Sequence, residues 1–192
     1  GVWALMEACR QLAEWQRAGY RLRMAVNVSA RQFRSEGFVA AVDRALRLHE
    51  IDPAALELEL TESVLIEDRV QAISILEQLK QLGVQIAVDD FGTGYSSLSY
   101  LSELPVDCLK IDQSFVVQTQ NGGRDTAIAQ AIISLGHALG LRVLAEGVET
   151  VEQLRFLRQY RCDECQGYLY ARPCAADALS GTLAEGSFAV AG

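Results

Sequence analysis

The stretch Gln85-Ile86-Ala87-Val88-Asp89-Asp90-Phe91-Gly92-Thr93-Gly94 runs from a short apolar strand directly into two acids and a glycine-containing loop. A helical pattern over residues 68–82, ending at Gly83, precedes it, and another predicted strand over residues 108–112 follows. The stretch therefore has the pattern of one strand and its following loop in a repeating α/β chain. Acids placed where a buried strand ends are typical of a functional site at the edge of a parallel sheet.

The alternation of helix and strand continues in both directions from this stretch. Helices are predicted over residues 2–17, 36–49, 68–82, up to 101, 124–139 and from 150 onward, with a turn at 121–123. Strands are predicted over residues 24–29, 56–61, 85–89, 108–112, 142–146 and 164–168. This order indicates an α/β fold with a parallel sheet. No dinucleotide fingerprint opens it, so we expect a (β/α)8-type barrel that is incomplete at the N-terminus, with about six of eight strands present.

The composition is that of one ordinary globular domain. Half of the 192 residues are hydrophobic and 22% are charged. No apolar run approaches the roughly 18 residues of a membrane span, so this segment is expected to make no membrane contact. The net charge of −8 disfavours DNA as a partner, and a phosphate substrate would need a bound cation beside it.

One polar side chain recurs near the end of every predicted strand. In chain order these residues are Asn27, Glu59, Asp89, Lys110, Glu146 and Gln166. Parallel strands bring their carboxyl ends to one rim, where barrel enzymes place their chemistry. Carboxylates gathered without histidine favour hard ions such as Mg²⁺ or Mn²⁺. The adjacent Asp89 and Asp90 could bridge two metals about 3.5–4 Å apart, provided that the backbone turns between them.

Simpler interpretations of these residues remain open. Glu59 or Glu146 alone could be an ordinary surface or capping carboxylate, and Lys110 could simply pair with Asp112. A magnesium-dependent lyase of the enolase kind would also place carboxylates on successive strands with a lysine base. The Asp-Asp pair followed by a glycine-rich loop argues against that enzyme class.

Two further features have no predicted part in the site. Glu57 is expected to point inward, one layer below the rim. Cys162 and Cys165 form a CxxC pair, but no second pair of zinc ligands lies at a suitable spacing. We therefore expect all five cysteines to be reduced, as in a cytosolic protein.

The motifs resemble those of the EAL domain, the bacterial phosphodiesterase module that hydrolyses cyclic di-GMP. The matching stretches are Asn27–Ser29, Glu59–Glu62, Asp89–Leu98, Lys110–Asp112, Glu146–Glu149 and Gln166–Tyr168. The resemblance covers residues 1–173 as a partial EAL domain and leaves residues 174–192 as a C-terminal tail of weak pattern.

The resemblance implies two Mg²⁺ or Mn²⁺ ions as cofactors, cyclic di-GMP as substrate and the linear dinucleotide pGpG as product. The implied metal ligands are Asn27, Glu59, Asp89, Asp90 and Glu146. The implied catalytic residues are Lys110, Glu146 and Gln166, with Lys110 holding the nucleophile or phosphate and Gln166 holding the water or a carboxylate. Glu62 and Glu149 are expected to support the loop that follows Asp90, and Arg31, Asp112 and Tyr168 are expected to contact the substrate.

The Glu-Ala-Leu segment that gives the family its name is not in this sequence, and in the family it lies on a strand before the point where this chain starts. We expect a longer parent protein to supply it, with sensory or GGDEF domains upstream and a homodimer formed through the EAL domain. The domain is expected to work in the cytoplasm, with a membrane anchor upstream in the parent left open, whereas this piece alone would hydrolyse its substrate weakly or not at all. The alternative is a catalytically inactive cyclic di-GMP receptor domain.

Overall fold

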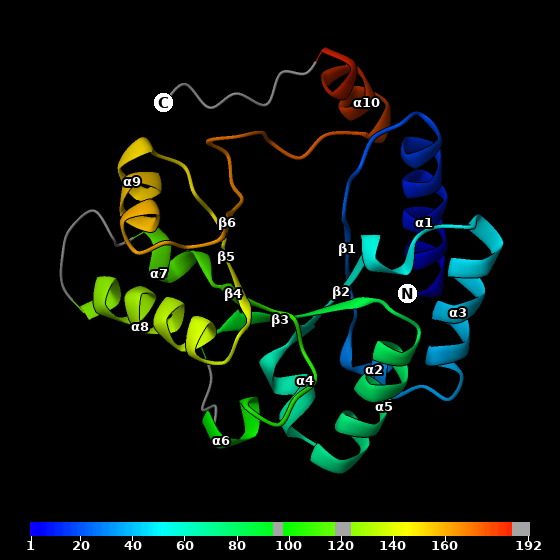
Figure 1. The fold of residues 1–192 in the computed structure, drawn as a ribbon, viewed down its shortest axis with the longest axis horizontal. Coiled ribbons are helices and arrows are strands. Elements are labelled where there is room, and N and C mark those ends of the chain that lie inside the picture. Colours follow the sequence, from blue (N-terminus) through cyan, green and yellow to red (C-terminus); the bar gives the residue numbers. More distant parts are fainter. Residues whose placement is uncertain (94–97, 118–123, 186–192) are drawn as a thin grey trace. The chain divides into compact units, whose positions relative to one another are not determined.

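The computed structural model describes residues 1–93, 98–117 and 124–185 (Figure 1). Its strands are β1 (Met24–Asn27), β2 (Leu56–Thr61), β3 (Gln85–Phe91), β4 (Cys108–Ile111), β5 (Arg142–Ala145) and β6 (Glu164–Cys165). They follow one another in the sheet in chain order. The described residues fall into two compact units, one of residues 1–88 and 98–107 and one of residues 89–93, 108–117 and 124–185.

Helices separate the strands. They are α1 (Val2–Arg17), α2 (Ala30–Phe33), α3 (Phe38–His49), α4 (Glu62–Ile66), α5 (Arg69–Gln81), α6 (Leu98–Leu101), α7 (Gln113–Val117), α8 (Arg124–Ala138), α9 (Val151–Gln159) and α10 (Ala176–Glu185). A 3-10 turn, η1 (Pro53–Ala55), leads into β2. The predicted α/β alternation is thus present along the described chain.

The first unit is built on amphipathic helices that cover a buried strand pair. Leu5, Cys9 and Leu12 recur every three or four residues and form the buried face of α1, which packs against α3 and β1 (Figure 1). β1 pairs with β2 in parallel, and the register places Asn27 beside Glu59. The leucines of β2 alternate with its two glutamates, so the hydrophobic and acidic side chains leave the strand on opposite sides.

The second unit contains the parallel pairs β4–β5 and β5–β6, with α8 packed on β4 and β5. The helix comes close to the sheet at Gly136, where a Cβ atom would lie 2.3 Å from Cγ2 of Val143. The register of β5 and β6 pairs Ala145 with Cys165, so the residues that follow each strand, Glu146 and Gln166, emerge next to one another.

The structure differs from the sequence prediction mainly where strands end. The strand predicted over 24–29 stops at Asn27, because Ser29 caps α2 in a capping box with Gln32. The strand predicted over 164–168 stops at Cys165, because the backbone around Gly167 folds against Val148, whose oxygen would lie 2.2 Å from a Cβ at residue 167. Helices α2, α4, α7 and α10 were not predicted.

Other predictions agree with the structure or fall outside it. The capping box at Thr150 and Gln153 is confirmed at the start of α9. Gly83 follows α5 with a φ of 90°, as expected of a residue that ends a helix. The predicted turn at 121–123 and residues 94–97 of the glycine-rich loop lie outside the described residues.

Candidate metal centre

The end of β3 turns two neighbouring aspartates toward one place. Side chains of successive residues in a regular strand point to opposite faces, so Asp89 and Asp90 would normally diverge. Asp90, however, has a φ of 53°, in the left-handed region that aspartate tolerates better than most residues. Its backbone N–H donates to Oδ1 of Asp89 at 3.1 Å. The turn expected between the two aspartates is therefore present.

A third carboxylate joins them from the end of β5. Glu146 directly follows that strand, and its backbone N–H donates to the carbonyl of Ile111 at 3.1 Å. One carboxylate oxygen each from Asp89, Asp90 and Glu146 lies within 4.8 Å of the others. This is the distance range in which oxygen atoms can share a cation, and a set of donors made only of oxygen suits Mg²⁺, Mn²⁺ or Ca²⁺.

Lys110 is the cation that the protein itself supplies to this cluster. It lies in β4, is only 2% exposed, and reaches Oδ1 of Asp89 at 2.9 Å and Oε1 of Glu146 at 2.7 Å. Lys110 therefore forms ion pairs with two acids of the cluster. Asp112, the other acid that could pair with it, accepts hydrogen bonds from the backbone and hydroxyl of Ser114.

Gln166 fixes the orientation of Glu146. The Nε2 atom of Gln166 donates to Oε1 of Glu146 at 2.6 Å, and its backbone N–H donates to the carbonyl of Ala145 at 2.9 Å. Lys110 and Gln166 therefore approach the same carboxylate oxygen from β4 and from the end of β6. An amide and an ammonium on one oxygen hold the Glu146 side chain in a single direction.

The cluster carries more negative charge than one lysine balances. Burial raises the pKa of Asp90 above its ordinary value, and the charges of Asp89 and Asp112 raise it further, with Lys110 opposing them. Burial also raises the pKa of Glu146, although Lys110 partly offsets this. Three acids with one ammonium leave an excess of anionic charge at neutral pH, which a divalent cation would relieve.

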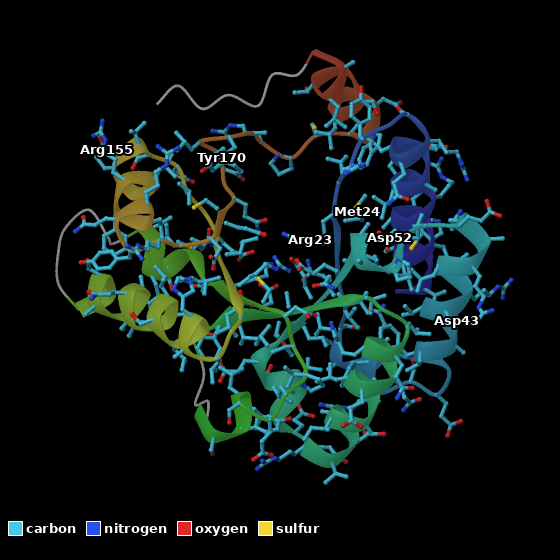
Figure 2. All side chains as sticks on the ribbon, viewed as in Figure 1. Arg23, Met24, Asp43, Asp52, Arg155 and Tyr170 are labelled. Atoms are coloured by element: carbon cyan, nitrogen blue, oxygen red, sulfur yellow. The ribbon has the colours of Figure 1, made fainter. Side chains whose placement is uncertain are left out.

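The first unit contains the other two predicted ligands, at the ends of its own strand pair. Glu59 is buried at 6% exposure and lies beside the exposed Asn27 in the register of β1 and β2. Glu57, which had no predicted role, is buried and forms an ion pair with Arg23 at 3.5 Å. Arg23, which lies just before β1 and is labelled in Figure 2, was not predicted to pair with Glu57. The usable signal was an arginine beside one strand and a buried acid on the strand next to it.

The remaining predicted residues are more scattered. Glu62 is buried at the first position of α4, whereas Glu149 is exposed and its backbone N–H donates to Oε1 of Gln153. Arg31 is exposed on α2. Tyr168 is 51% exposed, with the guanidinium of Arg172 4.5 Å from its ring centroid.

Comparison with known proteins places this geometry in a family. The family model described as EAL domain matches residues 1–173. The chain belongs to the EAL domain family. Its predicted α/β fold, a partial barrel with six parallel strands in the described residues, is confirmed by solved EAL domains. The "PaMucR Phosphodiesterase, c-di-GMP complex" is 47% identical, with a TM-score of 0.90 over 93% of this chain and 73% of that chain. The EAL domain of Mycobacterium smegmatis DcpA is 39% identical, with a TM-score of 0.90 over 96% of this chain and 83% of that chain.

Curated relatives carry names that describe cyclic di-GMP turnover. The "Bifunctional diguanylate cyclase/cyclic di-GMP phosphodiesterase MucR" of Pseudomonas aeruginosa is 46% identical over 185 residues, which is 96% of this chain and 27% of the relative. The "Cyclic di-GMP phosphodiesterase PdeR" of Escherichia coli is 41% identical over 179 residues, which is 93% of this chain and 27% of the relative. This EAL domain spans 22–27% of the length of the first curated relatives it matches. Within the described residues, no helix is both long and apolar enough to cross a membrane.

Proposed function

We propose that this EAL domain hydrolyses cyclic di-GMP to the linear dinucleotide pGpG with the help of two Mg²⁺ or Mn²⁺ ions. The observation that carries the proposal is the cluster of Asp89, Asp90 and Glu146, with its carboxylate oxygens within 4.8 Å of one another. The names of the relatives supply the substrate, since several of them are cyclic di-GMP phosphodiesterases.

The residues of the cluster fit divalent cations. All three side chains offer oxygen, and burial, together with the charges of neighbouring acids, raises the pKa values of Asp90 and Glu146, so a bound cation would favour their ionised forms. Asn27 and Glu59, each near the end of its own strand, are proposed to complete the ligand set. When bound, such ions neutralise phosphate charge and make a water molecule acidic enough to serve as the nucleophile.

The other residues of the site act on charge and orientation. Lys110 is proposed to place a fixed positive charge next to the scissile phosphate or the attacking water, because its ammonium already lies between two carboxylates of the cluster. Gln166 is proposed to keep Glu146 in the direction that the ions need. Glu62 and Glu149 are proposed to support the loop after Asp90, and Arg31, Asp112 and Tyr168 to contact the nucleotide.

The test is a turnover assay on the domain within its parent protein. Cyclic di-GMP is incubated with the protein in Mg²⁺, Mn²⁺ or EDTA, and pGpG is quantified by chromatography. Asp89→Asn should abolish hydrolysis while leaving the circular dichroism spectrum unchanged. Asp43→Asn, which alters only a surface pair with Arg47 on α3 (Figure 2), should hydrolyse at the original rate.

The outcome separates the enzyme from a receptor. Cyclic di-GMP that binds in EDTA and is never cleaved in either metal would identify a non-catalytic receptor domain. Hydrolysis by Asp89→Asn at the original rate would remove the cluster from the chemistry altogether.

The setting of the domain is part of the same proposal. The parent protein is proposed to work in the cytoplasm, with sensory or GGDEF domains attached and a homodimer formed through the EAL domain. The relatives support attached domains, because this chain spans only about a quarter of their length and one of them is named as bifunctional. Light scattering of the purified parent protein measures whether it is a dimer.

A further inference from the structure

Two turns carry the acids of the metal centre, and each contains a glycine with a positive φ. Asp89 and Asp90 lie near the end of β3 and are followed by Gly92, whose φ is 97°. Glu146 directly follows β5 and precedes Gly147, whose φ is 67°. Glycine adopts such conformations without a steric penalty, and it also lets another element approach the backbone closely.

Side chains of α7 occupy the space beside both glycines. A Cβ atom on Gly92 would lie 3.1 Å from Cε2 of Phe115 in α7 and 3.0 Å from Cδ1 of Ile132 in α8. A Cβ atom on Gly147 would lie 2.5 Å from Cβ of Gln113 and 3.4 Å from its Cα. The Cβ of Gln113 is bonded to the backbone of α7, so it cannot rotate away as the end of a long side chain would. One short helix thus contacts both turns that carry the acids.

The position of α7 is itself fixed by the strand before it and by α8. Asp112, the residue between β4 and α7, accepts a hydrogen bond from the backbone N–H of Ser114 at 2.9 Å. The backbone N–H of Phe115 donates to the carbonyl of Asp112 at 3.1 Å. Val116 is fully buried, and α7 packs against α8 (Figure 1). The helix therefore has a defined place relative to β4, the strand that carries Lys110.

We propose that Phe115 and Gln113 are positioning residues of the metal centre, with α7 as the spacer between its acids. Phe115 holds the turn that contains Asp90, and Gln113 holds the turn that begins with Glu146. Mg²⁺ demands near-ideal geometry, with oxygen ligands at about 2.0–2.1 Å, so a small shift of one turn weakens the whole site. This inference rests on the proposed function, because it assigns both residues to the ions of that reaction.

A positioning role differs from simple packing in what its loss changes. A side chain that only fills the core supports the stability of the domain, and its removal lowers Tm without altering the metal affinity of the molecules that stay folded. Loss of a residue that orients metal ligands typically weakens metal binding by about 10–100-fold. Because Phe115 acts through packing rather than through a hydrogen bond to a ligand, we expect an effect of about tenfold for Phe115→Ala.

The experiment measures Mn²⁺ binding to the parent protein without nucleotide. Free Mn²⁺ is quantified by electron paramagnetic resonance well below the Tm of each variant, and the sites that disappear in Asp89→Asn are assigned to the cluster. Phe115→Ala should weaken these sites about tenfold, and Phe115→Leu, which keeps a large apolar side chain, should recover most of the affinity. Val117→Ala is the matched control and should bind as the original protein does, since Val117 lies on the same helix and is 51% exposed.

A double substitution tests the contact at Gly147. Gly147→Ala places a Cβ against Gln113 and should weaken Mn²⁺ binding, and adding Gln113→Gly removes the atom that it meets. We expect the double variant to recover part of the loss, because the collision is relieved while the left-handed backbone remains unfavourable for alanine. A double variant that binds Mn²⁺ no better than Gly147→Ala would refute the role of Gln113.

Hydrolysis of cyclic di-GMP is then measured on the same variants over a range of Mn²⁺ concentrations. We expect Phe115→Ala to lower kcat with a smaller change in KM, and to recover part of the rate when Mn²⁺ is raised tenfold. A folded Phe115→Ala with lowered Tm and unchanged Mn²⁺ affinity would overturn the positioning role. If the original protein binds Mn²⁺ at the cluster and never cleaves cyclic di-GMP, the proposed function fails, whereas the Mn²⁺ affinities still decide the role of α7.

Discussion

Replacing Lys110 with methionine should destabilise the protein, and more strongly at alkaline than at acidic pH. The substitution keeps the length and the apolar stem of a side chain that is 2% exposed, but it removes the ammonium from Asp89 and Glu146. Three neighbouring carboxylates would then face one another without their internal cation. Their mutual repulsion is felt only while they are ionised.

The magnitude follows from the burial of the ion pairs. Removing one partner of a buried pair costs about 3–5 kcal/mol, and we take about 3 kcal/mol because the side chains of Asp89 and Glu146 remain 11% and 19% exposed. For a protein of this length, each kcal/mol shifts Tm by about 2–4 °C, so Tm should fall by about 6–12 °C at pH 8.

The pH dependence has a definite sign. Burial already raises the pKa of Glu146 in the folded state above the ordinary value of 4.5, and Lys110 opposes that rise. Without the lysine, the pKa of Glu146 in the folded state rises further above its value in the unfolded state. The folded protein then tolerates Glu146 best in its protonated form, which is present at low pH. That contribution to stability is lost as the pH increases through the folded-state pKa. The difference in Tm between the variant and the original protein should therefore be smaller at pH 5 than at pH 8.

The Tm of the variant and of the original protein is measured by circular dichroism during thermal unfolding, in EDTA at pH 5 and pH 8 and again with Mg²⁺. A ligand at 100 times its dissociation constant stabilises by about 2.7 kcal/mol, and the variant should gain more from Mg²⁺ than the original protein because the lysine no longer competes for the carboxylates. Lys80→Met is the matched control, since Lys80 pairs with Asp107 at 2.7 Å and has no place in the cluster. Equal losses of Tm at pH 5 and pH 8, or equal stabilisation by Mg²⁺ with and without Lys110, would refute the reasoning.

Three further predictions use the same structure. Lys110→Ala should lower kcat for cyclic di-GMP strongly with a smaller change in KM, and a change confined to KM in steady-state kinetics would make the residue a substrate anchor. Mg²⁺ and Mn²⁺ should support hydrolysis while Ca²⁺ inhibits it, because calcium takes longer bonds and more ligands; equal rates in the three metals would count against ions that position the nucleophile. Gly136→Ala should cost about 1–3 kcal/mol in urea denaturation, because its Cβ would lie 2.3 Å from Val143, whereas Gly181→Ala, in open space on α10, should be neutral or stabilising by about 0.4–1 kcal/mol. Similar stabilities for these two glycine variants would contradict the close packing of α8 on β5.

The sequence was sufficient for the elements that carry strong periodicity. The strict alternation of Leu56–Thr61 fixes β2 to the residue, because hydrophobic and acidic side chains must leave a strand on opposite sides. The acids at the ends of β3 and β5 were predictable as a cluster for a similar reason, since the parallel strands of one sheet bring their carboxyl ends to the same edge.

Details set by contacts distant in the chain could not be predicted in this way. β6 is short because the backbone at Gly167 packs against Val148, which no local pattern around residue 167 reveals. The ion pairs of Lys110 with Asp89 and Glu146 depend on where β3 and β5 bring these acids, which the sequence around residue 110 does not reveal. The capping box of Ser29 and Gln32, by contrast, was visible in the sequence as a serine followed three residues later by glutamine.

The left-handed backbone at Asp90 also limits which substitutions a chain of this kind can accumulate there. Residues other than glycine, asparagine and aspartate pay roughly 1–2 kcal/mol to adopt that conformation. Substitution of Asp90 by asparagine or glycine would therefore remove the carboxylate with little loss of stability. Substitution by alanine or valine would remove the carboxylate and also reduce the amount of folded protein. Related chains that lose hydrolysis should therefore carry asparagine or glycine at position 90 more often than other residues. A mutational scan that measures protein abundance separately from nucleotide turnover tests this. At position 90, only asparagine and glycine should keep the abundance while losing the turnover.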